Sequence, residues 1–326
     1  MALGLGLGLQ FQRKGGTEFN GLFDQFNYPA LGFSMRWLGR NYTGGLVRVR
    51  AFDATSDQGT ADVMPYQIGG EYWVDLSSRI DNLDAIATGR GLTNSNTLAD
   101  LVSSGVNNYN GFVTTWYNQG TPNHATQTTA SAQPQIVSSG NLVLENGKPA
   151  LQFGGNDYFA IPDFNYGLTD QLSVISVTDS GEGDIINQYN TTLNERSWRI
   201  SIDGSNKLLG FYSTNGVILG GIIFDSNTST QRLNFTYFDT NNATKGLRVI
   251  NYTNGIQQAT DLIQNPPSGN IHDSTASIAI GAVNIDTSPA VHFNGKMQEI
   301  AGYASDKIAD RLAIQDNVNS AYSIYP

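Results

Sequence analysis

Cysteine is absent from the 326 residues of this chain, and charged residues make up only 14% of them, against about 25% in an ordinary soluble domain. Without cysteine there is no disulfide framework and no thiolate chemistry, so the chain can fold in a reducing compartment. Acidic residues outnumber basic ones, which gives a formal net charge of −10. Nucleic acid and anionic lipid both attract clustered lysine and arginine, so we expect neither as a partner. No apolar run reaches the length of a membrane span, and we expect no membrane insertion.

Histidine is also scarce. The three histidines, His124, His272 and His292, stand alone in the sequence and fit no metal-binding spacing. The chain contains no GxGxxG fingerprint that opens a helix, no P-loop and no GxSxG nucleophile elbow. We therefore predict neither a metal site nor a bound cofactor.

Glycine, by contrast, is plentiful, with 36 residues, and Asn, Thr and Ser fill the polar positions. The most informative stretch is Gly111–Gly140, in which a β-branched and aromatic run, Phe112–Tyr117, is followed by a polar turn and a second extended run, Gln135–Val137. Further strand-like runs follow, separated by Asp-Gly, Asn-Gly or proline turns: Leu172–Thr178, Trp198–Ile202, Lys207–Tyr212, Val217–Phe224, Gln231–Phe238, Leu247–Tyr252, Ser277–Val283 and Lys296–Tyr303. Many short strands at regular spacing predict an all-β sandwich or jelly roll.

Two segments depart from this pattern. Leu31–Leu38 is expected to form a short helix or turn, and Val47–Phe52 after it an amphipathic strand with Arg48 and Arg50 outward. Near the end, Ser305 is predicted to cap a helix that covers a rim of the sandwich, with a repeating stripe formed by Ile308, Leu312, Gln315, Val318 and Tyr322. No repeat or linker divides the chain, so we assign residues 29–326 to one β-sandwich and residues 1–28 to an N-terminal arm and connector.

The N-terminal arm alternates leucine and glycine, with apolar residues at Leu3, Leu5, Leu7, Leu9 and Phe11. Period two describes a strand with one apolar face, and the arm has no evident hairpin partner within the chain. One interpretation is an assembly arm that adds to the sheet of another subunit; the other is a loosely packed terminus. The basic pair Arg13-Lys14 follows the apolar run, whereas a secretory signal places charge before it, so we do not expect a signal peptide.

Glycoside hydrolysis requires a pair of carboxylates, about 5–5.5 Å apart in retaining enzymes and about 6.5–9.5 Å apart in inverting ones. Asp203 and Asp286 lie in predicted turns late in the β region and form the pair to test. The alternative is that both aspartates serve only their local turns through backbone hydrogen bonds.

Several motifs resemble one lectin-like family. Thr114–Gln119, Asn123–Gln127 and Gln133–Val137 are similar to its "WYDQSGNGxHATQ…QPxIV" segment. Upstream, residues 31–50 are similar to its "YSLRxL…YTGPAVRVRR" opening, and Asn146–Asp157 resembles "NGKPALRFDGxDD". The family contains the catalytic domain of fungal α-L-arabinofuranosidase B and many phage and prophage virion proteins. The resemblance covers roughly residues 29–326 and implies a concanavalin-A-like (LamG-like) β-sandwich.

The resemblance does not carry the family's catalytic residues into this chain. The position of the family's nucleophilic glutamate falls near Gly204, and that of its proton-donating aspartate falls at Val283 or Asn284. The adjacent cysteines that line the family's sugar site have no counterpart. We therefore expect a protein that is not an enzyme, in which Asp203, Asn206, Asn284 and Asp286 are the candidate carbohydrate-binding residues.

Without the catalytic residues of the enzymes, the resemblance implies a bacteriophage virion protein. On this hypothesis it is a capsid-surface decoration, fibre or tail component, assembled in the host cytoplasm as a homo-oligomer among other virion proteins, with adhesion to host-surface glycans. The alternatives are a glycoside hydrolase resembling α-L-arabinofuranosidase, which acts on host or environmental polysaccharide, and a free-standing lectin. Trp116 and Tyr117 either stack on sugar rings or belong to the core.

Overall fold

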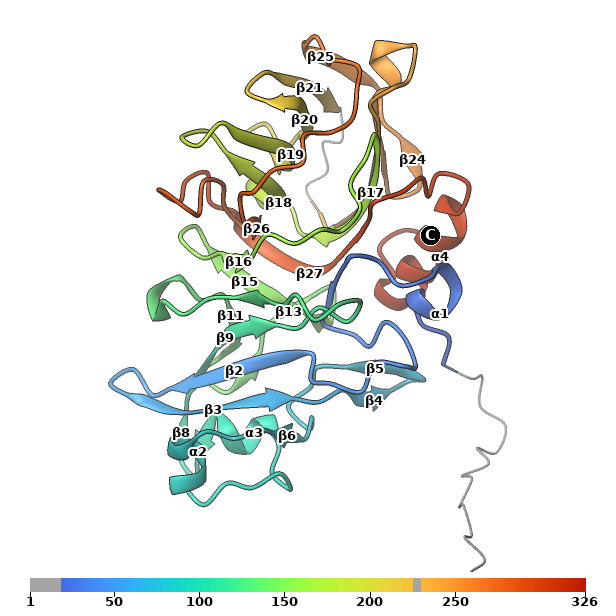
Figure 1. The fold of residues 1–326 in the computed structure, drawn as a ribbon. Helices are drawn as coiled ribbons and strands as arrows, with labels where there is room; N and C mark the ends of the chain where they lie inside the picture. Colours follow the sequence, from blue (N-terminus) through green and yellow to red (C-terminus); the bar gives the residue numbers. More distant parts are fainter. Residues whose placement is uncertain (1–18, 225–229) are drawn as a thin grey trace, which may run out of the picture.

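Strands dominate the computed structural model, which describes residues 19–224 and 230–326. The chain forms an all-β sandwich of the jelly-roll kind with one long helix, α4 (Arg311–Tyr322), close to its C-terminus, which confirms the predicted fold class (Figure 1). The arm residues Leu3, Leu5, Leu7, Leu9 and Phe11 lie outside the described residues. None of the helices in the described part of the chain combines the length and apolar composition that a membrane-spanning helix needs.

One layer of the sandwich is centred on the longest strand, β27 (Asn294–Tyr303). One edge of β27 pairs with β17, while the other pairs with β15 through its first half and with β1 through its second half. Across the layer the strands are β24 (Ile256–Gln257), β23 (Val249–Thr253), β22 (Arg232–Asp239), β17 (Gln171–Thr178), β27, β1 (Leu31–Ser34) beside β15 (Leu151–Gly154), β11 (Gln135–Ser138), β9 (Asn110–Trp116), β2 (Val47–Phe52), β3 (Asp57–Val63) and β6 (Ile80–Asp81).

The second layer is antiparallel too and joins the first through β9, because Ala125 of β10 pairs with Trp116 of β9. Its strands are β25 (Thr260–Gln264), β21 (Leu219–Phe224), β20 (Leu208–Gly216), β19 (Glu195–Ile202), β18 (Gly183–Asn190), β26 (Ile278–Ile280), β16 (Phe159–Ile161) and β10 (Ala125–Thr126). The shorter elements are α1 (Leu22–Phe26), α2 (Ala85–Gly89), α3 (Leu98–Leu101), β4 (Tyr66–Ile68), β5 (Glu71–Trp73), β7 (Ser103–Ser104), β8 (Asn107–Asn108), β12 (Asn141–Leu142), β13 (Leu144–Glu145), β14 (Lys148–Pro149) and the 3₁₀ turns η1 (Ala130–Ala132) and η2 (Lys245–Leu247).

The main core fills the space between the two layers. Alternate residues of β2 and β9 point into it, including Val49 and Val113, and Trp116 is fully buried there. The Trp116 ring lies 5.7 Å from Phe33 and 6.2 Å from Phe159. Burying aromatic rings of this size contributes most of the hydrophobic stabilisation of such a core. The other residues of β2 and β9 alternate with these buried ones and point to the outer face of the sheet, where they can form a surface site.

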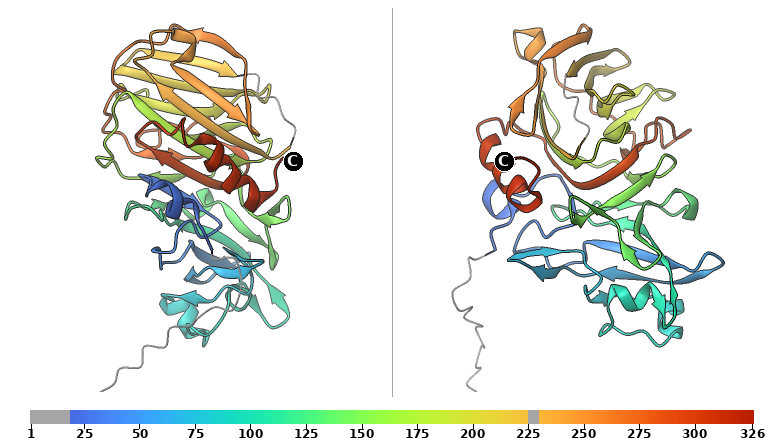
Figure 2. Two further views of the ribbon diagram at one scale, coloured as in Figure 1. Left: turned by 90° about the vertical axis from the view of Figure 1, so that its right-hand side faces the viewer. Right: turned by 180° about the vertical axis from the view of Figure 1, so that it is seen from behind.

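A second core lies between α4 and the outer face of β17, β22 and β27 (Figure 2). Ile314, Val318 and Tyr322 of α4 are buried against it, and Leu22 and Phe23 of α1 complete the layer. At the base of α4, the buried Arg36 donates from Nε to Glu299 Oε2 at 2.8 Å and from Nη2 to Asn317 at 2.9 Å. This buried charge network fixes the helix to the central strand.

Two local predictions were wrong. Leu31–Ser34 is strand β1, not a helix or turn; all four residues are buried, as in a strand that is covered on both faces. The C-terminal helix begins at Arg311 and not after Ser305. The residues expected to form its first turn are not helical. The Lys307 N–H donates to Ser173 Oγ and the Ile308 N–H donates to the Asp306 carboxylate, so neither makes a helical hydrogen bond.

Candidate functional site

The outer face of β2, β9, β11 and β15 carries a cavity of about 550 Å³. Its walls combine two aromatic rings with amide and carboxylate side chains, a composition typical of sites that bind polar ligands with an apolar face. The lining residues are Arg50, Phe52, Asp57, Phe112, Ala130, Ser131, Gln133, Gln135, Gln152, Gly154, Asn156 and Asp157. We call this cavity the amide groove.

The register of four strands aligns the floor of the amide groove. Arg50 pairs with Phe112, Phe112 with Gln135, and Gln135 with Gln152. Residues directly opposite each other in paired strands share a face of the sheet, so these four side chains form one transverse row. With neighbouring strands about 4.8 Å apart, the row is roughly 14 Å long.

Arg50 holds the two aromatic rings in place. Its guanidinium lies 5.2 Å from the centre of the Phe112 ring and 5.4 Å from that of Phe52, and the two ring centres are 6.5 Å apart. Both phenylalanines are only partly buried, so each ring keeps an accessible surface. Arg50 itself is buried and donates to Gln133 Oε1 at 2.8 Å and to Asp57 Oδ1 at 2.5 Å. The cation orders the rings and does not project into solvent.

Two carboxylates stand at the groove in different environments. Asp57 is half-exposed and ion-paired with Arg50. Asp157 is buried, and this burial raises the pKa of its carboxyl although the Gly154 N–H donates to Oδ2 at 2.6 Å. The cavity thus carries one half-exposed carboxylate in an ion pair and one buried carboxyl that is less acidic than usual.

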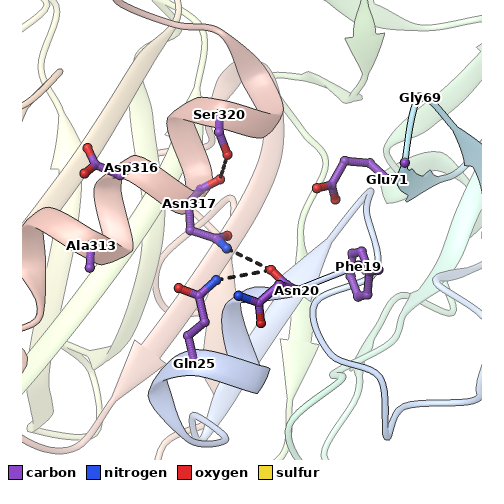
Figure 3. A pocket seen from close by; sticks show the side chains of 10 residues that line it. Phe19, Asn20, Gln25, Gly69, Glu71, Ala313, Asp316, Asn317 and Ser320 are labelled. Atoms are coloured by element: carbon purple, nitrogen blue, oxygen red, sulfur yellow. Dashed lines mark hydrogen bonds between the residues drawn. The ribbon is translucent and has the colours of Figure 1, made fainter. Parts of the chain in front are cut away.

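A second cavity, of about 440 Å³, lies between α4, α1 and the turn joining β4 to β5 (Figure 3). Three of its polar side chains donate to backbone carbonyls: Asn317 and Gln25 both donate to the Asn20 carbonyl at 3.2 Å, and Ser320 donates to the Asn317 carbonyl at 2.8 Å. These contacts tie the first described residues to α4. We therefore assign this cavity to the packing of the first described residues against α4. The amide groove is the stronger candidate for a ligand site.

The structure divides the four predicted site residues into two pairs. Asp203 and Asn206 lie in the turn between β19 and β20, where Asp203 Oδ1 accepts the N–H groups of Ser205 and Lys207 at 2.9 Å. Asn206 takes a positive φ of 66° and accepts hydrogen bonds from Arg232 through its carbonyl and its side chain. Both residues are engaged in shaping this turn. Their part in sugar binding stays a prediction.

The other pair lies at the opposite end of β18. Asn284 Oδ1 accepts the Thr191 N–H at 2.8 Å, and Asp286 Oδ2 accepts the Ser277 N–H at 2.9 Å.

The separation of the two pairs follows from the strand register. Ile202, just before Asp203, pairs with Gly183 at the start of β18. The Asn284 N–H, in contrast, donates to the carbonyl of Tyr189 near the end of β18. Five or six residues of strand separate the two pairs, which is about 17–20 Å. Asp203 and Asp286 therefore do not meet the spacing of a glycosidase pair. None of the four residues lines the amide groove.

Trp116 does not stack on a ligand, because it is fully buried in the core. Tyr117 is partly buried, donates to Asp62 at 2.7 Å and packs edge-on against His124 with ring centres 4.9 Å apart. The core interpretation of Trp116 is confirmed.

Four groove residues were not predicted from the sequence: Phe52, Phe112, Gln135 and Gln152. The available signal was the outward position of these residues in alternating strands, and five groove residues lie within Gly111–Gly140, the stretch that already stood out.

A buried ion pair lies in the second layer, away from the groove. Arg199 binds Asp184 in a bidentate arrangement, with both nitrogen–oxygen distances 2.7 Å. Burial raises the pKa of Asp184 to about 6, although the neighbouring Arg199 lowers it. Within the described residues, no group of three or more His, Asp or Glu side chains is arranged to hold a metal ion.

No protein-family model and no curated protein matches this chain. Among solved structures, a GH54 α-L-arabinofuranosidase soaked with a cyclic sulfate inhibitor is 13% identical with a TM-score of 0.46; the match covers 90% of this chain and 63% of that one. An arabinofuranosidase complexed with arabinofuranosyl-α-1,2-xylobiose is 14% identical with a TM-score of 0.45 and the same coverage. The CBM40 domain of Ruminococcus gnavus IT-sialidase is 13% identical with a TM-score of 0.34, over 44% of this chain and 82% of that domain. The chain thus spans less than two thirds of the arabinofuranosidases, and these distant similarities assign it no ligand or reaction.

Proposed function

We propose that the protein is a non-catalytic carbohydrate-binding component of a bacteriophage particle, which uses the amide groove to adhere to host-surface glycans. The observation that carries the binding role is the transverse row in which Phe112 stands beside Gln135 and Gln152. Sugar rings have apolar C–H faces that pack on aromatic rings, and hydroxyl groups that hydrogen-bond to amides and carboxylates. The groove presents both kinds of partner on one rigid sheet.

The virion role is supported by the sequence. The motifs in residues 31–50, 114–137 and 146–157 resemble those of phage and prophage virion proteins, and the Asn-, Thr- and Gly-rich composition suits an exposed particle surface. The alternating Leu3–Phe11 segment suits an arm that joins copies of the chain or docks on other virion proteins. On this proposal the mature protein is a homo-oligomer on the particle.

A glycan array tests the binding role. The full chain is expected to bind a defined set of glycans, and Phe112→Ala to lose that binding at least 10-fold, because it removes the central stacking surface. Tyr66→Ala, which removes an exposed ring from β4 outside the groove, is the matched control and should bind as the wild type does. An empty array, or equal loss in both variants, contradicts the proposal.

A glycoside hydrolase is the second candidate, favoured by the presence of Asp57 and Asp157 on one cavity with unlike environments. Such a difference is how one carboxyl is kept as general acid while its partner stays ionised. Hydrolysis of polysaccharides or arabinofuranosides that is abolished by both Asp157→Asn and Asp57→Asn would establish this candidate over the non-catalytic one. Binding without turnover supports the adhesin.

A further inference from the structure

Three side-chain amides of the groove, those of Gln135, Gln152 and Asn156, donate through their nitrogen atoms to backbone carbonyls. Gln135 donates from Nε2 to the Val137 carbonyl at 3.0 Å, and Gln152 donates from Nε2 to the carbonyls of Phe153 and Gly295 at 3.0 and 3.2 Å. Asn156 donates from Nδ2 to the Ser131 carbonyl at 2.7 Å. A carbonyl oxygen is only an acceptor, so of the two ends of a side-chain amide only the nitrogen can bond to it, and these contacts fix the orientation of each amide.

The amide oxygens are consequently left for a ligand. No hydrogen bond from the described residues reaches Oε1 of Gln135, Oε1 of Gln152 or Oδ1 of Asn156. The free oxygen of Asp57, Oδ2, adds a further acceptor on the opposite wall, since only Oδ1 is bound to Arg50. The groove therefore offers several acceptors beside its rings.

Among the described residues, no unpaired cationic side chain lines the same walls to receive an anionic ligand. Arg50 is the one basic side chain among the lining residues, and its Nε, Nη1 and Nη2 are directed to Gln133, Asp57 and the Ala130 carbonyl. The side-chain Nε2 of Gln133 donates to the Gln127 carbonyl at 3.0 Å. A ligand carboxylate or sulfate would meet amide oxygens and the Asp57 carboxylate, and it would be desolvated without a cationic partner.

We infer that the amide groove selects uncharged saccharides, bound through hydroxyl groups that donate to Gln135, Gln152 and Asn156, and rejects acidic ones. This inference rests on the proposed carbohydrate-binding function and specifies its ligand class. Gln152 is the last groove-lining residue of the transverse row and acts as a specificity-determining residue. The next residue in the register, Lys296 of β27, does not line the groove, and its Nζ is bound to Glu145 at 3.0 Å and to the Leu144 carbonyl at 2.9 Å. A buried acceptor left without a donor disfavours the wrong ligand more strongly than an added contact favours the right one.

The test is a glycan array in which each neutral oligosaccharide has a counterpart bearing one carboxylate or sulfate, followed by titration calorimetry on the strongest pair. The wild type is expected to bind the neutral member at least 10-fold more tightly, with Phe112→Ala abolishing the difference. Gln152→Lys places an ammonium group beside Gln135 and is expected to reduce or reverse this preference. Because the new lysine stands opposite Lys296, the unfolding midpoint of the variant is measured beside that of the wild type to show that it is folded.

The outcomes distinguish a failure of the selectivity for uncharged saccharides from a failure of the carbohydrate-binding function itself. Equal or tighter binding of the acidic member, lost in Phe112→Ala, overturns the selectivity and leaves the carbohydrate-binding function in place. An unchanged preference in a folded Gln152→Lys variant also overturns the role given to Gln152. The absence of any binding in the wild type overturns the proposed function together with the selectivity.

Discussion

Phe112 of β9 stands directly opposite Arg50 of β2, and the Arg50 guanidinium lies 5.2 Å from the centre of the Phe112 ring. Both residues line the amide groove, in which the arginine is buried and the ring is only partly buried. A cation that is already paired with Asp57 can order the ring without attracting anionic ligands. This contact links the packing of the sheet to the composition of the groove.

Replacing Arg50 should therefore disturb both stability and the groove. Arg50→Ala removes the stem and the cation that pack on two rings and leaves Gln133 without its donor, so we expect the free energy of unfolding to fall by about 2 kcal/mol. Arg79→Ala is the control, because the Arg79–Asp81 pair is largely exposed and such pairs contribute about 0–1 kcal/mol. Urea unfolding monitored by tryptophan fluorescence measures both; equal small losses would contradict the role of Arg50.

Glu299 holds the buried network beneath α4. It accepts hydrogen bonds from Arg36, from Ser34 at 2.8 Å and from Tyr322 at 3.2 Å. Burial lowers the pKa of Arg36, but the Glu299 carboxylate outweighs this and raises it above its usual value.

Glu299→Gln leaves the Arg36 charge without its partner, and we expect a loss of about 3–5 kcal/mol in the free energy of unfolding. Glu145→Gln, which breaks the partly exposed Lys296 pair, should lose less than about 1 kcal/mol. Denaturant titration measures the free energy of unfolding of both variants. A loss of less than about 1 kcal/mol in Glu299→Gln would show that the buried network does not stabilise the packing of α4 on the sheet.

Asp184 should make stability depend on pH. Its folded-state pKa of about 6 lies above the unfolded value of about 3.9, so the folded chain binds the proton more tightly. Stability relative to Asp184→Asn is therefore highest below pH 4 and decreases by about 2–3 kcal/mol as the pH rises to 6.5, since one pKa unit corresponds to about 1.4 kcal/mol. Unfolding of both proteins at pH 4, 5, 6 and 7 measures the difference. A difference that does not change with pH contradicts the raised pKa.

The N-terminal arm is tested by deletion. Removal of residues 1–18 is expected to convert a homo-oligomer into a monomer, because the leucine-rich face would be lost, while circular dichroism stays that of a β-sandwich. Substitution of Leu3, Leu5, Leu7 and Leu9 by serine in the full chain should have the same effect. Sedimentation velocity over a range of concentrations gives the oligomeric state, and an unchanged oligomer would exclude the arm as its cause.

The sequence predicted those parts of the fold that depend on local signals. The predicted Asp203-Gly204 turn separates β19 from β20, because such a turn needs only a few adjacent residues. The Asn215-Gly216 turn was placed slightly too early, since these residues end β20 and the break before β21 falls at residues 217–218. Strand β18 was missed: its polar residues, among them Asp184 and Asn187, are buried, so its sequence lacks the alternation of a half-exposed strand.

The groove could not be predicted from the sequence in the same way. Arg50, Phe112, Gln135 and Gln152 come from four strands, and their alignment depends on three strand registers that no local motif encodes. The candidate residues Asp203 and Asp286 were chosen for turn position, and turns at opposite ends of β18 cannot meet. Sequence patterns thus identified the scaffold, whereas pairing between distant strands created the groove.

The most direct test of the account is the affinity of the best array glycan for the wild type, Phe112→Ala and Tyr66→Ala, measured by titration calorimetry. The account predicts that Phe112→Ala weakens binding at least 10-fold, about 1.4 kcal/mol or more, while Tyr66→Ala binds as the wild type does. Wild-type affinity in a folded Phe112→Ala variant would contradict it, because the glycan would then bind elsewhere on the protein.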